Sequence, residues 1–229
     1  MKRILLSVIV SIVLLAAVFT GCSGADKTVS TVKATEAQYT DEKGVGYNES
    51  ADGKLYVSSF SNNASKLKIP PQVKGKKVTE IGRSSLKMNK LKSLELPDTI
   101  EKIDDYAFAF SRTLESVNIP DSVREIGTNA FAGCVKLKEI KLPKNLETIG
   151  MFSFDATALK TISIPKSVKE IKEYAFAECK SLNNITFNSK NTKIADTVFN
   201  NSPKVKITAP KNSTAVKLAK SKGIDYKIK

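Results

Sequence analysis

Residues 114–136 read LESVNIPDSVREIGTNAFAGCVK, and the next 22 residues, 137–158, read LKEIKLPKNLETIGMFSFDATA. Both segments begin with Leu and carry an alternating apolar run that ends at Pro. A second apolar pair follows, and then a small residue before Phe. A spacing of 22 or 23 residues separates five such units, which begin at Leu91, Leu114, Leu137, Leu159 and Leu182. Because one unit cannot bury its own apolar positions, whereas stacked units share a continuous core, the pattern predicts a solenoid.

Each unit predicts one short strand that ends at Pro, a second extended stretch and a compact helical turn that carries Phe inward. In the first unit quoted, Leu114, Val117 and Ile119 are the apolar positions of the leading strand, and Phe131 is the inward aromatic residue. The one-residue difference in length falls between the Phe and the next Leu, as expected of a surface loop. The fold is therefore predicted to be a right-handed solenoid, mainly β with short helical turns, with its regular repeats at residues 91–204.

The two ends of the array differ from the units between them, as the caps of a solenoid do. Residues 45–90 contain a degenerate first unit at Ile69-Pro70, preceded by a hairpin with its turn at Asp52-Gly53. Residues 205–229 contain a last strand, a short helix over 213–222 and a closing strand. We interpret these two segments as the N-terminal and C-terminal caps.

The units share the form L-x-x-[ILV]-x-[ILF]-P followed by I-G-x-x-A-F-x-x-C, and this pattern resembles the BspA-like bacterial leucine-rich repeats. Residues 126–134 match the whole second motif, whereas Lys172 and Ala195 replace its Gly in later units. The resemblance covers residues 45–229 and implies a leucine-rich-repeat solenoid. Members of that family are mostly secreted or surface proteins, and where a role is known it is adhesion or interaction with other macromolecules. The resemblance therefore implies a binding role.

Residues 1–21 have the composition of an export signal, with Lys2 and Arg3 ahead of an almost wholly apolar run over 4–19. These sixteen residues are fewer than the roughly 20 that span a membrane. Small residues then lead into Cys22, which resembles the lipobox of bacterial lipoproteins, where the Cys sulfur carries diacylglycerol. The resemblance implies a lipoprotein signal peptide at 1–21 and a mature chain lipid-anchored to the outer face of a bacterial membrane. An uncleaved anchor helix, or cleavage elsewhere, is the alternative.

Residues 22–44 are rich in Thr, Ser, Ala, Lys and Glu and have no sustained apolar period. This composition predicts a flexible stalk. As a random coil it would span roughly 25 Å and would lift the repeat domain off the membrane.

The amino-acid composition excludes most familiar enzyme mechanisms. Histidine and tryptophan are absent and only three cysteines occur among 229 residues, so His-based acid–base catalysis and His metal sites are excluded. The sequence has no Gly-rich phosphate loop and no Cys-x-x-Cys pair. A Ser–Lys dyad is compatible with the composition, but the repeats account for nearly all apolar positions and leave no evident catalytic domain. We expect no enzymatic activity, no cofactor and no metal.

The charge is concentrated at the two ends. Lys and Arg total 37 against 23 Asp and Glu, for a net charge of +14, and residues 66–92 carry +8, residues 93–203 carry −1 and residues 204–229 carry +7. Two interpretations stay open: the ends attract anionic partners such as lipid headgroups, envelope polymers or acidic glycans, or they prevent edge-to-edge aggregation of an open sheet. Only four of the 37 basic residues are Arg, so specific nucleic-acid binding is not expected.

Cys134 and Cys179 occupy the same position in units two repeats apart. Stacked strands lie about 4.8 Å apart, so the two residues would be roughly 10 Å apart, beyond the reach of a disulfide. We expect both to be buried and structural, and a reactive thiol or a metal pair is the alternative. The position needs a small side chain with a polar atom, because the other units place there Asn89, Ser111, Thr157 and Ser202.

The outward side chains of the leading strands form the candidate binding face. They are small and polar, two from each unit: Ser93 and Glu95, Ser116 and Asn118, Glu139 and Lys141, Thr161 and Ser163, Asn184 and Thr186. The face has no Trp, Tyr or Arg, the residues that usually dominate binding energy, so modest affinity raised by many copies on one surface is expected. A solvated face without a partner is the alternative.

These features predict a monomeric, lipid-anchored cell-surface protein that mediates recognition of, or adhesion to, an extracellular or envelope macromolecule, either a protein or a glycan. One alternative is a structural envelope component that binds anionic polymers through its basic caps. Another is a solute-binding lipoprotein, although the sequence gives no sign of two lobes around a cleft.

Overall fold

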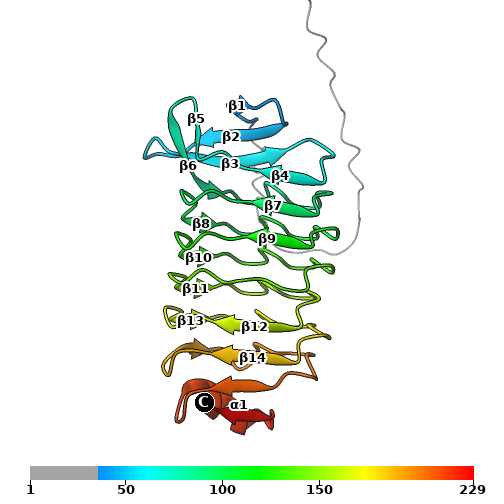
Figure 1. Ribbon diagram of the computed structural model, residues 1–229, viewed down its shortest axis with the longest axis vertical. Helices are drawn as coiled ribbons and strands as arrows, with labels where there is room; N and C mark the ends of the chain where they lie inside the picture. The colour runs from blue at the N-terminus through cyan, green and yellow to red at the C-terminus, as the bar shows by residue number, and fades with distance from the viewer. Residues whose placement is uncertain (1–35) are drawn as a thin grey trace, which may run out of the picture. The chain divides into compact units, whose positions relative to one another are not determined.

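The computed structural model describes residues 36–229 (Figure 1). The predicted signal peptide, Cys22 and the stalk up to residue 35 lie outside the described residues. Residues 36–229 form a compact unit with its own hydrophobic core, which runs from Val45 to Ala219. Within this unit, no helix has both the length and the apolar character needed to cross a membrane.

Two parallel sheets run along the array, one for each extended stretch of the repeat (Figure 1). The first sheet consists of two groups of strands, which are β4 (Lys66–Lys68), β7 (Ser93–Glu95) and β9 (Ser116–Asn118), and then β12 (Thr161–Ile164), β14 (Asn184–Phe187), β16 (Ile207–Ala209) and β17 (Tyr226–Ile228). The second sheet continues without a break through β6 (Lys76–Ile81), β8 (Lys102–Ile103), β10 (Glu125–Ile126), β11 (Thr148–Ile149), β13 (Glu170–Ile171) and β15 (Lys193–Ile194). The register sets Ile103, Ile126 and Ile149 beside one another. One repeat of 22 or 23 residues is therefore one turn of the solenoid, and the predicted leucine-rich-repeat solenoid is confirmed.

The third side of each repeat is a series of β-turns and differs from the predicted helical turn. In the unit at 127–134, the N–H of Ala130 donates to the carbonyl of Gly127, three residues earlier, at 3.4 Å. Asn129 and Gly133 have φ angles of 55° and 70°, in the left-handed region. A right-handed helix cannot pass through residues of that hand, so the chain turns repeatedly instead of continuing as a helix.

We call these stacked turns the turn column. In it, alternate N–H groups point along the solenoid: Phe108 donates to the carbonyl of Ala130, and Phe131 donates to that of Ser153, each at 2.8 Å. The Phe side chains stack inside the column, with ring centroids 4.9 Å apart for Phe108 and Phe131 and 5.4 Å apart for Phe131 and Phe154. The column is therefore held by a hydrogen-bond ladder between repeats, as the two sheets are.

The folded chain begins earlier than the composition indicates. Strand β1 (Tyr39–Thr40) pairs antiparallel with β2 (Val45–Glu49), whereas the composition predicts a flexible stalk as far as residue 44. The carboxylate of Asp41 accepts the N–H groups of Lys43 and Val45, each at 2.9 Å. This turn joins the segment to the cap through hydrogen bonds of the backbone and of one carboxylate. Because these contacts need no apolar side chains, the sequence shows no apolar period here.

The N-terminal cap contains the predicted hairpin. Strands β2 and β3 (Leu55–Phe60) pair antiparallel, and β3 pairs parallel with β6, the first strand of the repeating second sheet. The short strand β5 (Gln72–Val73) turns back on β6. The hairpin therefore covers the first turn, as predicted.

The C-terminal cap contains the predicted helix, α1 (Thr214–Lys222). Ser213 is its N-cap and accepts the N–H of Val216 at 3.2 Å, while Gly223 ends it with a φ of 66°. Leu218 is buried against the core. Strand β17 then pairs with β16 and closes the first sheet.

Candidate binding face

The predicted binding face lies on the outer side of the first sheet. The register sets Ser93 beside Ser116 and Thr161 beside Asn184, so the outward side chains form rows along the solenoid. Seven of the predicted residues are exposed, namely Glu95, Ser116, Asn118, Glu139, Lys141, Thr161 and Ser163, and the half-buried ones are Ser93, Asn184 and Thr186. The strands therefore present eight of the ten side chains on one side, as their alternation requires, and Glu139 and Lys141 are exposed in an extended segment that forms no strand.

Lysines extend both rows beyond the predicted residues. Lys66 lies beside Ser93 and Lys68 lies beside Glu95, with the Lys68 Nζ 3.1 Å from the Glu95 carboxylate. At the other end, Lys227 of β17 continues the row. Lys66 and Lys68 could have been added to the face from the sequence, because residues 66–70 read KLKIP and repeat the strand ending of the regular units.

The first sheet opens at residues 139–142, where the face is hollowed. These residues form no strand, so one group of strands ends at β9 and the next begins at β12, while the second sheet continues from β10 to β11. A groove of about 680 Å³ lies at this opening. Half of the predicted residues line it: Ser116, Glu139, Lys141, Thr161 and Ser163.

The groove has an apolar floor and a polar, charged rim. Val117, Ile140 and Ile162 line it, and Ile140 is half-buried where the repeat pattern predicts a core residue. Lys144 also lines the groove; its backbone N–H donates to the carboxylate of Asp121 at 2.9 Å, and its Nζ lies 3.0 Å from the same carboxylate. These two contacts lower the pKa of Asp121. The groove therefore offers apolar contact, hydrogen bonds and both signs of charge.

The cysteines are hydrogen-bond donors in the core. The sulfur of Cys134 lies 3.3 Å from the carbonyl oxygen of Phe108, and that of Cys179 lies 3.2 Å from the carbonyl oxygen of Phe154. Both thiols are free, and burial raises the pKa of Cys134 to about 12 and raises that of Cys179. The prediction of buried structural cysteines is confirmed. Within residues 36–229, no three acidic or thiol side chains gather as a metal site requires.

The repeats of this chain match the model of a known protein family. The BspA type leucine-rich repeat region matches six copies in this chain, over residues 54–114 and 102–219. The chain belongs to the BspA-type leucine-rich repeat family. Leucine-rich-repeat solenoids are generally non-enzymatic binding scaffolds, and the family suggests a protein-recognition or surface-protein role. A comparison with curated proteins finds no match.

Solved structures of bacterial leucine-rich repeat proteins share the fold of this BspA-type chain. A leucine-rich repeat protein from Bacteroides ovatus is 31% identical, with a TM-score of 0.66 over 77% of this chain and 48% of the other. The pneumococcal vaccine antigen PcpA is 26% identical, with a TM-score of 0.66 over 82% and 49%. The T. pallidum leucine-rich repeat protein is 28% identical, with a TM-score of 0.62 over 64% and 70%. The chain spans about half the length of the first two proteins.

Proposed function

We propose that this chain is an exported, lipid-anchored surface protein that recognises an extracellular or envelope macromolecule. It does so through the ten-residue candidate binding face on the outer side of the first sheet, which we call the first-sheet face. The groove at residues 139–142 is the observation that carries this proposal. Its volume of about 680 Å³ lies within the size range of small-molecule pockets, so the groove can hold part of a larger partner, and it opens on the face that carries the ten predicted residues. Because this face has no aromatic or Arg anchor, the affinity of one copy is modest and many anchored copies raise it.

The proposed anchor is a diacylglycerol on the sulfur of Cys22. The charged start, the apolar run over 4–19 and the small residues before Cys22 support it. The test is to express the full-length chain in bacteria fed radiolabelled palmitate. The wild type should take up the label and sediment with membranes, whereas Cys22→Ala should remain unlabelled. A labelled Cys22→Ala chain would show that another residue carries the lipid.

The proposed binding is tested with residues 36–229, which form a compact unit of their own. This fragment is titrated onto whole bacterial cells, purified envelope polymers, immobilised glycans and matrix proteins at low salt and at about 0.15 M salt. Saturable binding that persists at the higher salt is expected. Asn118→Arg with Thr161→Arg places two long side chains on the face, and Thr161 lines the groove. This pair should weaken binding by about tenfold or more.

A charge-matched pair provides the control. Glu125→Gln with Glu173→Gln adds the same net charge at exposed positions outside the first sheet, so it should leave binding unchanged. If the two pairs of substitutions have the same effect, net charge rather than the first-sheet face controls the attraction, and the recognition proposal fails.

A second candidate function, attachment to anionic envelope polymers, is supported by the lysines at both ends of the first sheet. Lys66 and Lys68 are exposed at one end, and Lys206 and Lys227 are exposed at the other. Attraction by these lysines should fall steeply between low and physiological salt. It should also be insensitive to Asn118→Arg with Thr161→Arg and should weaken in Lys66→Glu with Lys68→Glu.

A further inference from the structure

The ladder of the turn column ends at the last repeat. The repeat before it keeps two rungs, from Phe176 to Val198 and from Glu178 to Asn200 at 2.9 Å, whereas its Tyr174 N–H has no acceptor among residues 36–229. In an earlier repeat, the N–H groups of Tyr106, Phe108 and Phe110 donate to carbonyls of the next repeat at 2.7 to 2.8 Å. The equivalent N–H groups of the last repeat belong to Thr197, Phe199 and Asn201. None of these three groups has an acceptor among residues 36–229. The end of the column therefore presents a row of backbone donors.

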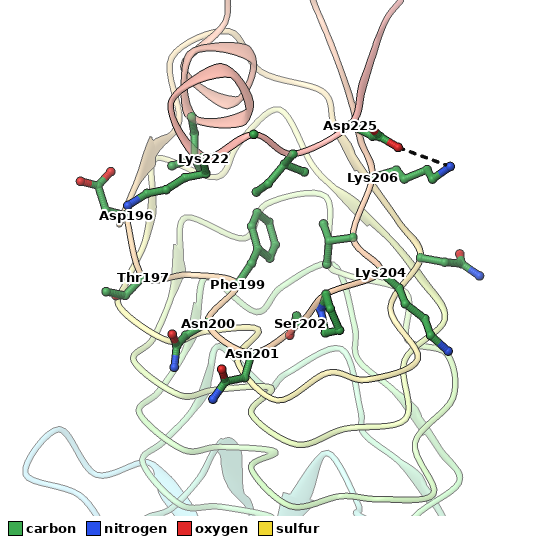
Figure 2. Close-up of a pocket in the computed structure, with 16 residues that line it drawn as sticks. Asp196, Thr197, Phe199, Asn200, Asn201, Ser202, Lys204, Lys206, Lys222 and Asp225 are labelled. Atoms are coloured by element: carbon green, nitrogen blue, oxygen red, sulfur yellow. Dashed lines mark ion pairs between the residues drawn. The ribbon is translucent and has the colours of Figure 1, made fainter.

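A pocket of about 930 Å³ occupies the place where a further turn would stack (Figure 2). Thr197, Phe199 and Asn201 all line it, and Leu218 of α1 and Ile224 line it from the C-terminal cap. We call it the C-terminal pocket. Figure 2 shows the Phe199 ring in the middle of the lining side chains. The pocket therefore combines backbone donors with apolar surface.

Phe199 is the last ring of the aromatic stack. Its centroid lies 6.2 Å from that of Phe176, and the two planes differ by 27°, whereas Phe154 and Phe176 are 5.4 Å apart and differ by 3°. Phe176 is fully buried and Phe199 is half-buried. An apolar side chain in the pocket could therefore cover part of Phe199 that the protein leaves in water.

The rim of the C-terminal pocket favours an acidic occupant. Lys204, Lys206 and Lys222 line it together with Asp196 and Asp225. Lys206 lies 3.6 Å from the Asp225 carboxylate, whereas Lys204 and Lys222 form no ion pair within residues 36–229. Because the whole segment 204–229 carries +7, its field attracts negative charge.

The same charges disfavour a second copy of this chain as the occupant. Stacking head to tail would bring the N-terminal end against residues 204–229, which carry +7; residues 36–65 carry −3 and residues 66–92 carry +8, so the N-terminal end has a net charge of +5. Repulsion between these ends opposes that arrangement. A partner of opposite charge is therefore favoured over a second copy.

We propose that the C-terminal pocket binds an extended segment of an acidic partner protein. Alternate backbone carbonyls of the segment would accept the N–H groups of Thr197, Phe199 and Asn201, an apolar side chain would rest on Phe199, and acidic residues would lie near Lys204 and Lys222. Polypeptide is the occupant that fits, because alternate carbonyls of polypeptide fill the equivalent place on the earlier repeats. This site is separate from the first-sheet face and does not depend on the function proposed for that face.

A peptide probe can be taken from the chain itself. The synthetic peptide DDGTNAFAGDD places the sequence of residues 127–133 between pairs of aspartates, so that it offers the backbone of a further turn, one Phe and acidic ends. Residues 36–229 are mixed with this peptide, and the exchange of each amide hydrogen is measured by NMR. At about nine-tenths occupancy, exchange at Thr197, Phe199 and Asn201 should slow by roughly tenfold. Exchange at Glu139, in the first-sheet groove, should not change.

Two pairs of substitutions locate the effect. Lys204→Glu with Lys222→Glu reverses two exposed charges without touching the core, so it should abolish the protection. Asn118→Arg with Thr161→Arg lies on the other face and should leave the protection intact. A peptide with Lys in place of Asp should protect poorly, because it reverses the charge but keeps the backbone.

Three results would overturn the proposal. The first is unchanged exchange at the three amides in excess peptide. The second is protection that survives Lys204→Glu with Lys222→Glu, which would remove the acidic character assigned to the partner. The third is protection by polygalacturonate without protection by the peptide, which would make the pocket a site for acidic glycans.

Discussion

The thiol of Cys134 donates a hydrogen bond to the backbone carbonyl of Phe108 in the preceding repeat, with 3.3 Å between sulfur and oxygen. Ser202 fills the same position in the last repeat, and its hydroxyl donates to the carbonyl of Phe176 at 2.8 Å. The position therefore joins one turn to the turn before it through a small donor, and serine already performs this role in the same fold.

Cys134→Ser should accordingly leave the free energy of unfolding within about 1 kcal/mol of the wild type. Cys134→Leu should lower it by about 1–3 kcal/mol, because it adds volume at a fully buried position and removes the donor. Urea denaturation of the 36–229 fragment measures both values. A Leu variant more stable than the Ser variant would refute the role assigned to the hydrogen bond.

The buried thiol also predicts a loss of stability at high pH. Burial raises the pKa of Cys134 to about 12, whereas the thiol of an unfolded chain titrates near 8.5. Because the folded pKa is the higher one, the contribution of this group is fully present below about pH 8.5 and is lost as the pH rises towards about 12. Each pH unit in that window costs up to about 1.4 kcal/mol for this group.

Cys134→Ser removes this titration. The free energy of unfolding of the wild type should therefore fall relative to that of the variant between about pH 8.5 and 10.5, as measured by urea denaturation at each pH. The pKa of Cys179 is also raised by burial, so Cys134→Ser with Cys179→Ser should flatten the profile further. Parallel profiles for the wild type and both variants would mean that neither thiol is held in its protonated form.

The stacking of the repeats was predictable from the sequence, whereas the conformation of the turns was not. The apolar period itself sets one turn of the solenoid, so the alignment of Ile126 with Ile149 follows from the spacing. Positive φ angles occur at Ser84, Asn129 and Phe152, which hold equivalent places in three turns but have unlike side chains. Hydrogen bonds between neighbouring repeats favour that conformation, and the sequence of a single repeat does not indicate which N–H groups form them.

The candidate face was similarly predictable only in part. Strand alternation placed Thr161 and Ser163 outward, but nothing in the unit that contains Ile140 marked the opening of the sheet, because that unit keeps the apolar pattern of its neighbours. The C-terminal pocket exists because no further turn stacks on the turn that contains Phe199. Such a site becomes visible only when the last turn is placed against the cap.

The aromatic stack predicts a graded response to truncation. Phe154 lies between Phe131 and Phe176, 5.4 Å from each, and is fully buried. Phe154→Ala should lower the free energy of unfolding by about 3–5 kcal/mol. Phe154→Leu should cost clearly less, because Leu86 holds the equivalent place in the first turn. Phe110→Ala, at a ring that is 44% exposed, should cost less than about 1 kcal/mol. Urea denaturation should reproduce this order, and an equal cost for Phe154→Ala and Phe110→Ala would refute it.

The close approach of two glycines in the turn column gives the last prediction. A Cβ added at Gly150 would lie 2.5 Å from the carbonyl carbon of Gly127 and 2.6 Å from its oxygen. Because this neighbour is backbone, the two turns must separate, which also strains the hydrogen bond from the Gly150 N–H to the Ile126 carbonyl at 2.8 Å. Gly150→Ala should therefore lower the free energy of unfolding by about 1–3 kcal/mol and speed amide exchange at Phe131, whose N–H bridges the same two turns.

Lys172 is the matched control, because it holds the equivalent place in the next turn, already has a Cβ and is exposed. Lys172→Ala should change the free energy of unfolding by no more than about 0.5 kcal/mol. If Gly150→Ala has as small an effect as Lys172→Ala, the two turns have room for a side chain between them. Lack of space for a side chain would then not explain why this position is Gly at 127 and 150 but Lys at 172.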